Sequence, residues 1–175
     1  MTNRRSPTIA RRRGDVPLRL RVARRADLAQ LVELQRQAMA TERGFSPDLV
    51  ARRFVGRTAR RCFARDLRAR SARWWVALHA GRVVGMLGAD LRIAKGVYAP
   101  VRRHVLLHSM YVEPNARRAR AGWRLIRTAL RWASRQRATQ VRLETAYGNS
   151  GAQRLYERVG FARREIFYTL TLRPR

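Results

Sequence analysis

The stretch MYVEPNARRARAGWRLI, residues 110–126, indicates both how the chain folds and where it binds a ligand. An apolar run ends at Val112, a turn follows at Pro114, and a helical pattern of apolar residues begins after Arg120. A strand that passes through a short loop into a helix directs the free N–H groups of the first helical turn, and the positive end of the helix dipole, at one place. Such a junction is suited to binding a phosphate or pyrophosphate group.

Outward from this segment, periodicity predicts alternating strands and helices. We expect strands at 16–23, 74–79, 82–92, 104–112, 140–145 and 165–172, helices at 27–39, 46–67, 120–136 and 149–158, and a loop at 95–103. Ala80 and Gly81 have the character of a hairpin turn between the second and third strands. This order predicts a single α/β domain with a mixed sheet over residues 16–175, preceded by a flexible basic arm at residues 1–15.

The composition is strongly basic, with 40 Lys and Arg against 11 Asp and Glu and a net charge of +29. Hydrophobic residues make up 46% of the chain, which is enough for a packed core, but no run of about 18 apolar residues exists that could span a membrane. The single cysteine, Cys62, cannot form an intrachain disulfide, and no apolar segment follows the basic N-terminal residues. We therefore expect a cytoplasmic protein.

The positive charge is concentrated in three stretches. Residues 1–25, 51–73 and 117–137 each hold eight more basic than acidic residues, whereas residues 26–50 are net acidic. The helices expected at 46–67 and 120–136 each place their arginines on the side opposite the apolar residues. Three interpretations remain open for these faces: a polyanion such as nucleic acid or the ribosome, an anionic membrane surface, or no specific anion.

A second segment, VRLETAYGNSGAQRLYERVGF at 141–161, completes the signal. Together the two segments resemble the GCN5-related N-acetyltransferase (GNAT) superfamily, with its V-x-P-x-x-R-x-x-G-x-G loop and its N-x-x-A-x-x-L-Y-E-x-x-G-F block. The chain supplies Val112, Pro114, Arg117 and Gly122 of the first motif, and Asn149, Ala152, Leu155, Tyr156, Glu157, Gly160 and Phe161 of the second. The resemblance implies a mostly antiparallel sheet that splays between the strands at 104–112 and 140–145, flanked by helices.

The resemblance also implies acetyl-CoA as co-substrate. Backbone groups of Met110 and Val112 would bind its pantetheine arm, Arg117, Arg118, Arg120 and Gly122 its pyrophosphate, and Asn149 is a further contact. One position departs from the pattern, because Arg120 replaces the first glycine of the loop. Its side chain either adds a guanidinium to the anion site or crowds the cofactor and weakens binding.

The LET and LYE segments match the ribosomal-protein N-acetyltransferase branch of the superfamily, which implies Glu144 as the base and Tyr156 as the acid of a direct transfer to an amine. Other interpretations remain open: an arginine partner for Glu144, core packing for Tyr156, and an N-cap role for Asn149. His104 and His108 share a strand face but stand about 13 Å apart, too far for one metal ion, so we expect no metal site.

The acceptor implied by this branch, and by the basic helices, is an amine on a ribosomal protein, a tRNA or another polyanion. A polycationic small acceptor would be repelled by the basic surroundings unless the acidic residues of 26–50, Glu33, Glu42 and Asp48, line its pocket. The alternative function is an RNA- or DNA-binding module on a GNAT scaffold that has lost acetyl-CoA binding. The short span after Phe161 further predicts strand pairing between two chains, and hence a homodimer.

Overall fold

The computed structural model describes residues 17–45, 56–93, 103–166 and 168. Its elements are β1 (Arg19–Val22), η1 (Arg25–Asp27), α1 (Leu28–Glu42), α2 (Arg57–Asp66), β2 (Ala72–His79), β3 (Arg82–Ile93), β4 (Arg103–Val112), α3 (Pro114–Arg117), α4 (Ala121–Arg135), β5 (Gln140–Leu143) and α5 (Ser150–Val159). The predicted arm at 1–15 lies outside these residues.

The five strands form one sheet in sequence order, β1 to β5. The first three pairings are antiparallel, whereas β4 and β5 are parallel. The β2–β3 hairpin turns at Ala80 and Gly81, which have φ values of 48° and 78°. Two successive left-handed residues are the requirement of a tight hairpin turn whose twist matches the strands. The α/β class and the mixed, mostly antiparallel sheet are thus confirmed.

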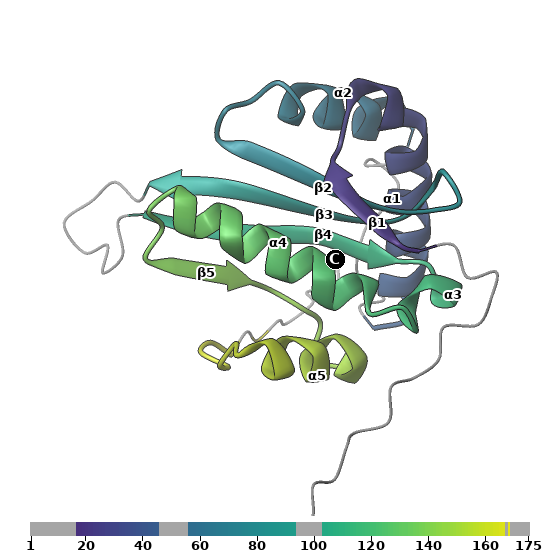
Figure 1. Ribbon diagram of the computed structural model, residues 1–175. Helices are drawn as coiled ribbons and strands as arrows, with labels where there is room; N and C mark the ends of the chain where they lie inside the picture. Colours follow the sequence, from purple (N-terminus) through teal and green to yellow (C-terminus); the bar gives the residue numbers. More distant parts are fainter. Residues whose placement is uncertain (1–16, 46–55, 94–102, 167, 169–175) are drawn as a thin grey trace, which may run out of the picture.

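Helices cover both faces of the sheet (Figure 1). On one face, α1 and α2 pack through Leu31, Leu34 and Phe63 onto a cluster that includes Trp74 and Val76 of β2. On the other face, α4 buries its apolar side against the sheet through Leu125, Ile126, Ala129, Trp132 and Ala133. Burial of a leucine or isoleucine side chain stabilises the fold by about 1.5–3 kcal/mol. The amphipathic pattern of α4 therefore fixes which side of this helix faces solvent.

Several predicted boundaries differ from the structure. The single helix expected over 46–67 is wrong at Gly56, where a φ of 75° excludes helical backbone, so α2 begins at Arg57, and residues 46–55 lie outside the described part. A short helix, α3, follows Pro114 and was not expected. The strand expected at 140–145 ends at Leu143, which places Glu144 just beyond it. Glu165 and Ile166 are in no strand, and most of 165–172, like the loop at 95–102, lies outside the described residues.

Candidate active site

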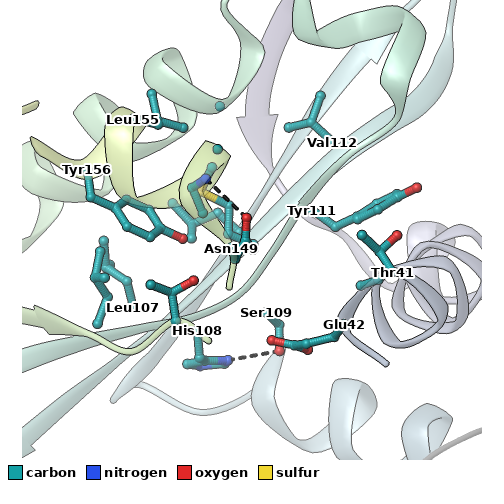
Figure 2. A pocket seen from close by; sticks show the side chains of 18 of the residues that line it. Thr41, Glu42, Leu107, His108, Ser109, Tyr111, Val112, Asn149, Leu155 and Tyr156 are labelled. Atoms are coloured by element: carbon teal, nitrogen blue, oxygen red, sulfur yellow. Dashed lines mark hydrogen bonds between the residues drawn. The ribbon is translucent and has the colours of Figure 1, made fainter. Parts of the chain in front are cut away.

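A cavity of about 900 Å³ opens between α1, the second half of β4, the start of α4 and the β5–α5 segment. Figure 2 shows Leu155 and Tyr156 entering it from α5, with Thr41 and Glu42 opposite them on α1. Eight of the site residues expected from sequence line this cavity: Met110, Val112, Arg117, Arg120, Gly122, Glu144, Asn149 and Tyr156. Arg118 is exposed and is not among the lining residues.

The cavity forms where β4 and β5 separate. Their pairing ends at Leu107 and Leu143, although β4 continues to Val112. Between Met86 and Gly88 the β3–β4 register shifts, and β4 gains one residue there. Ser109, at this bulge, has a φ of 50°. Bulges re-aim a strand and interrupt its pairing, and this one leaves the backbone beyond Leu107 without a β5 partner. This is the splay that the motifs implied.

The start of α4 forms one end of the cavity. The N–H groups of its first turn have no acceptor within the helix, and its N-cap, Arg120, has a left-handed backbone (φ 56°, ψ 29°) with no side-chain cap. Arg117 and Arg120 add two guanidinium groups to this end of the cavity wall. The Arg117 Nε donates a hydrogen bond to the Val112 carbonyl at 3.0 Å, so this side chain also holds the loop against β4. The charge and the free donors together favour an anion at this position.

Gly122 is required by close packing. A Cβ at this position would lie 2.9 Å from the Met110 methyl carbon and 3.1 Å from a Leu155 methyl carbon. The glycine therefore lets β4 and α5 approach the start of α4.

Glu144 and Tyr156 reach the cavity from the two ends of the β5–α5 segment. Glu144 is exposed and has no ion-pair partner among the described residues, despite the excess of arginine. Burial, and to a lesser degree the charge of Glu42, raise the pKa of the Tyr156 hydroxyl above its usual value. The tyrosine is therefore protonated at neutral pH and able to donate a proton, while the carboxylate is free to accept one.

Asn149 is the N-cap of α5, a role that the sequence had left open. Its Oδ1 accepts a hydrogen bond from the Ala152 N–H at 3.1 Å, which makes it the N-cap of α5. The Gln153 Nε2 donates to the Tyr147 carbonyl at 2.6 Å and so braces the turn before this helix. These contacts fix the position of α5, and hence of Tyr156, relative to Glu144.

His108 lies on the cavity wall between two polar partners. Its Nδ1 is 3.4 Å from the Ser109 hydroxyl (Figure 2), and its Nε2 is 3.4 Å from an Asp90 carboxylate oxygen. The imidazole also packs edge-on against Trp74, with ring centroids 5.1 Å apart. Packing against Trp74 holds this imidazole at the cavity wall, and its buried Nε2 makes no hydrogen bond within the described residues. Among the described residues, no group of three or more metal-ligating side chains lies together.

The model of the acetyltransferase (GNAT) family matches residues 32–161 of the chain, which include the β4–α4 junction and the β5–α5 segment. The chain belongs to this family. Membership identifies it as an acetyltransferase domain with acetyl-CoA as co-substrate, and favours the enzyme over a nucleic-acid-binding module. The match is to the family as a whole, so the ribosomal-protein branch stays a prediction.

The acetyltransferase is also similar to individual proteins. It is 34% identical over 110 residues to N-acetyltransferase family 8 member 3 of Mus musculus, a match that covers 62% of this chain and 47% of the relative. The match thus spans about half the length of that relative. At 34% identity over this range, the likeness is consistent with the family assignment.

Solved structures show the same fold. A predicted acetyltransferase from Clostridium acetobutylicum, crystallised with acetyl-CoA, has a TM-score of 0.71 and 17% identity over 88% of this chain and 96% of its own. An aminoglycoside antibiotic 6'-N-acetyltransferase from Acinetobacter baumannii has a TM-score of 0.67 and 14% identity, over 89% and 99% of the two chains. Both likenesses concern the arrangement of elements alone.

Sequence reasoning missed part of the acetyltransferase cavity wall. The face of α1 that contributes Gln35, Ala38 and Thr41, together with Phe45 just beyond the helix, was not predicted to line the site. The spacing of these residues is helical, but nothing in it distinguishes a core from a cavity wall. Only the net acidic character of residues 26–50 pointed toward this region.

Proposed function

We propose that the chain is an acetyl-CoA-dependent N-acetyltransferase that moves an acetyl group to a primary amine by direct transfer. One observation carries the proposal: Glu144 and Tyr156 line the same cavity as the start of α4 and the second half of β4, which has no β5 partner. Acetyl-CoA supplies the activated acetyl thioester. The chain supplies the groups that bind this donor and that move protons.

The donor set of the cavity fits the co-substrate. The free N–H groups at the start of α4, with Arg117 and Arg120, suit a pyrophosphate, and Arg118 is placed beside them in sequence. The β4 backbone at Met110 and Val112 would hydrogen-bond the amide groups of the pantetheine arm in place of a neighbouring strand. Asn149 lines the same cavity while it caps α5, so it would contact the co-substrate through the remainder of its amide.

The roles of the two proton-transfer groups follow from their surroundings. An amine must lose a proton to attack the thioester carbon, and Glu144, with no arginine partner among the described residues, would accept it directly or through a water molecule. The new C–N bond replaces the C–S bond, and the departing thiolate takes a proton from the Tyr156 hydroxyl. The raised pKa of this hydroxyl keeps the proton in place until the thiolate forms.

Substitution of these two groups tests the proposal. Glu144→Gln and Tyr156→Phe should each slow transfer by about 10²–10⁴-fold while acetyl-CoA binds as before. Glu165→Gln and Tyr147→Phe are matched controls, because both side chains are exposed and outside the cavity. Unchanged transfer rates in the Glu144 or Tyr156 variants would remove these residues from their roles.

For the acceptor, we propose an amine carried by a ribosomal protein, a tRNA or another polyanion in the cytoplasm. The arginines of two helices support this: Arg57, Arg60, Arg61 and Arg65 of α2, and Arg124, Arg127, Arg131 and Arg135 of α4, are exposed. Like charges at three- and four-residue spacing destabilise a helix unless anions neutralise them. The part of the chain that the structure describes contains no helix long and apolar enough to cross a membrane.

Salt dependence tests the polyanion. RNA binding should weaken steeply with salt, and Arg127→Glu with Arg131→Glu should lower the slope of log affinity against log salt by about one for each phosphate that these side chains neutralise. These residues lie outside the cavity, so acetylation of a small amine should not change. Binding that is insensitive to the two substitutions would exclude α4 as the RNA-binding face.

We also propose that the chain forms a homodimer, because the span after Phe161 is short for two strands. Light scattering tests this proposal, and a monomer in solution would contradict it.

A further inference from the structure

The residues of the two motifs account for the pantetheine arm and the pyrophosphate of acetyl-CoA, but not for its adenosine. In the proposed arrangement the pyrophosphate lies at the start of α4, and the pantetheine arm follows β4 toward Glu144 and Tyr156. The adenosine is joined to the other end of the pyrophosphate, so it leaves the start of α4 in the direction away from these two side chains. A side chain that binds the adenine must therefore line the cavity at the first turn of α4.

Trp123 has this position. It lies in the first turn of α4, directly after Gly122, and it lines the cavity. Trp123 is 40% exposed, whereas Trp74, Trp75 and Trp132 belong to the two core clusters and are at most 7% exposed. The core therefore does not bury this indole, and its exposed surface can contact a ligand in the cavity.

Arg127 determines which side of the indole a ligand can reach. Its guanidinium carbon lies 5.3 Å from the centroid of the Trp123 ring, which is a cation–π contact. Arg127 follows Trp123 by one helical turn, so it covers the ring from the C-terminal side of α4. The other side of the ring is turned toward Arg120 and the cavity. An indole held in this way offers a flat surface on which a second aromatic ring can stack.

The charge around Trp123 suits a nucleotide. Arg117, Arg120 and Arg158 line the same cavity, and among the described residues none of the three has a carboxylate within 4.0 Å. Guanidinium groups without a carboxylate partner attract phosphates, and an aromatic side chain beside them can stack on the base that the phosphates accompany. A purine with phosphates on its ribose matches both properties.

We infer that Trp123 is the stacking surface for the adenine of acetyl-CoA. This inference rests on the proposed function, because it concerns the co-substrate of that same cavity. Position 123 lies between the two motifs, which specify no residue there, so the contact belongs to this chain and not to the motif pattern. Adenosine 3′,5′-bisphosphate, which lacks the pantetheine arm, should consequently bind on its own.

Fluorescence quenching by acrylamide tests the contact, because Trp123 is the exposed one of the four tryptophans. Adenosine 3′,5′-bisphosphate should lower the quenching constant of the wild-type chain to that of Trp123→Phe, in which the exposed indole is missing. Pantetheine is the matched control ligand and should leave the constant unchanged. Protection by an unstructured oligouridylate but not by adenosine 3′,5′-bisphosphate would assign the ring to a nucleic acid and overturn the inference.

Calorimetry separates this inference from the proposed function. Trp123→Ala should bind acetyl-CoA about fivefold more weakly, the lower end for base stacking because Arg127 covers one side of the ring, and Trp123→Phe should lose less. Tyr147→Ala is the matched control, since this exposed aromatic side chain lies outside the cavity.

The outcomes for the two proposals differ. Acetyl-CoA binding of wild-type strength in Trp123→Ala would overturn the stacking contact and leave the proposed function intact. If the wild-type chain bound no acetyl-CoA, the proposed function would fail, whereas binding of adenosine 3′,5′-bisphosphate that Trp123→Ala weakens would still support the contact. Transfer from acetyl-pantetheine, which has no adenosine, should have the same kcat/KM in wild type and Trp123→Ala, and a loss there would contradict the inference.

Discussion

Replacing Arg120 with glycine separates two effects of this side chain, backbone strain and anion binding. Arg120 has a left-handed backbone, with φ 56° and ψ 29°, at the N-cap of α4. This conformation costs a residue with a side chain about 1–2 kcal/mol, whereas glycine adopts it freely but loses about 0.5–1 kcal/mol more on folding. Arg120→Gly should therefore raise the free energy of unfolding by up to about 1 kcal/mol.

The same substitution should weaken acetyl-CoA binding. Arg120 lines the cavity at the α4 end, beside the free N–H groups that we assign to the pyrophosphate. A hydrogen bond between charged groups contributes about 1.5–3 kcal/mol, and we take the lower end because the guanidinium is exposed. A loss of about 1.5 kcal/mol corresponds to about tenfold weaker binding.

Urea unfolding and calorimetry with acetyl-CoA measure the two effects separately. Arg120→Ala is the matched control, because it removes the guanidinium but keeps the left-handed strain: it should lose the same affinity and gain no stability. If Arg120→Gly bound acetyl-CoA as tightly as wild type or more tightly, the side chain would crowd the co-substrate and our assignment would be refuted.

Three further predictions concern stability and protonation. In Gly88→Ala, the new Cβ would lie 2.5 Å from a ring carbon of His108, so the free energy of unfolding should fall by about 1–3 kcal/mol. Gly151→Ala is the control: the atom nearest to its new Cβ is 3.9 Å away, and the free energy of unfolding should rise by about 0.5 kcal/mol. Urea unfolding measures both. The hydrogen-bonded guanidinium of Arg21 lowers the pKa of Asp27, so Asp27→Asn should cost about 2 kcal/mol at pH 7. That cost should begin to fall below about pH 4, the unfolded pKa, and should disappear only below the lowered folded pKa, because the stabilisation is lost as the pH falls through the folded value. Since burial raises the pKa of Tyr156, ultraviolet titration of wild type and Tyr156→Phe should show no difference in ionisation below about pH 10, and an ionisation near pH 8 would contradict the proton-donor role.

The elements with long, regular periodicity could be predicted from sequence. The alternation of β2 and β3 around Ala80 and Gly81, and the amphipathic pattern of α4, each determine one local structure. The start of α2 was harder to predict from sequence, because a single glycine is tolerated in many helices. Only the positive φ of Gly56 reveals that the helix begins after it. Helix α3 was missed because four residues are too few to show a period.

The site could be predicted where a local motif carries it. Glu144 and Tyr156 belong to one continuous strand-turn-helix segment, so their relation is set over twelve residues. The contribution of α1 depends on tertiary packing across the sheet, which no local pattern records. Gln35 illustrates this, because a glutamine at helical spacing is usually exposed, whereas this one is only 7% exposed and lines the cavity.

Calorimetry of the full chain, freed of nucleic acid, with acetyl-CoA tests the central claim most directly. We expect saturable binding of one acetyl-CoA per chain, weakened about tenfold by Arg120→Ala and unaffected by Tyr156→Phe. The cavity between β4, α4 and α5 would then be the co-substrate site. The absence of any binding heat at millimolar acetyl-CoA would contradict the claim.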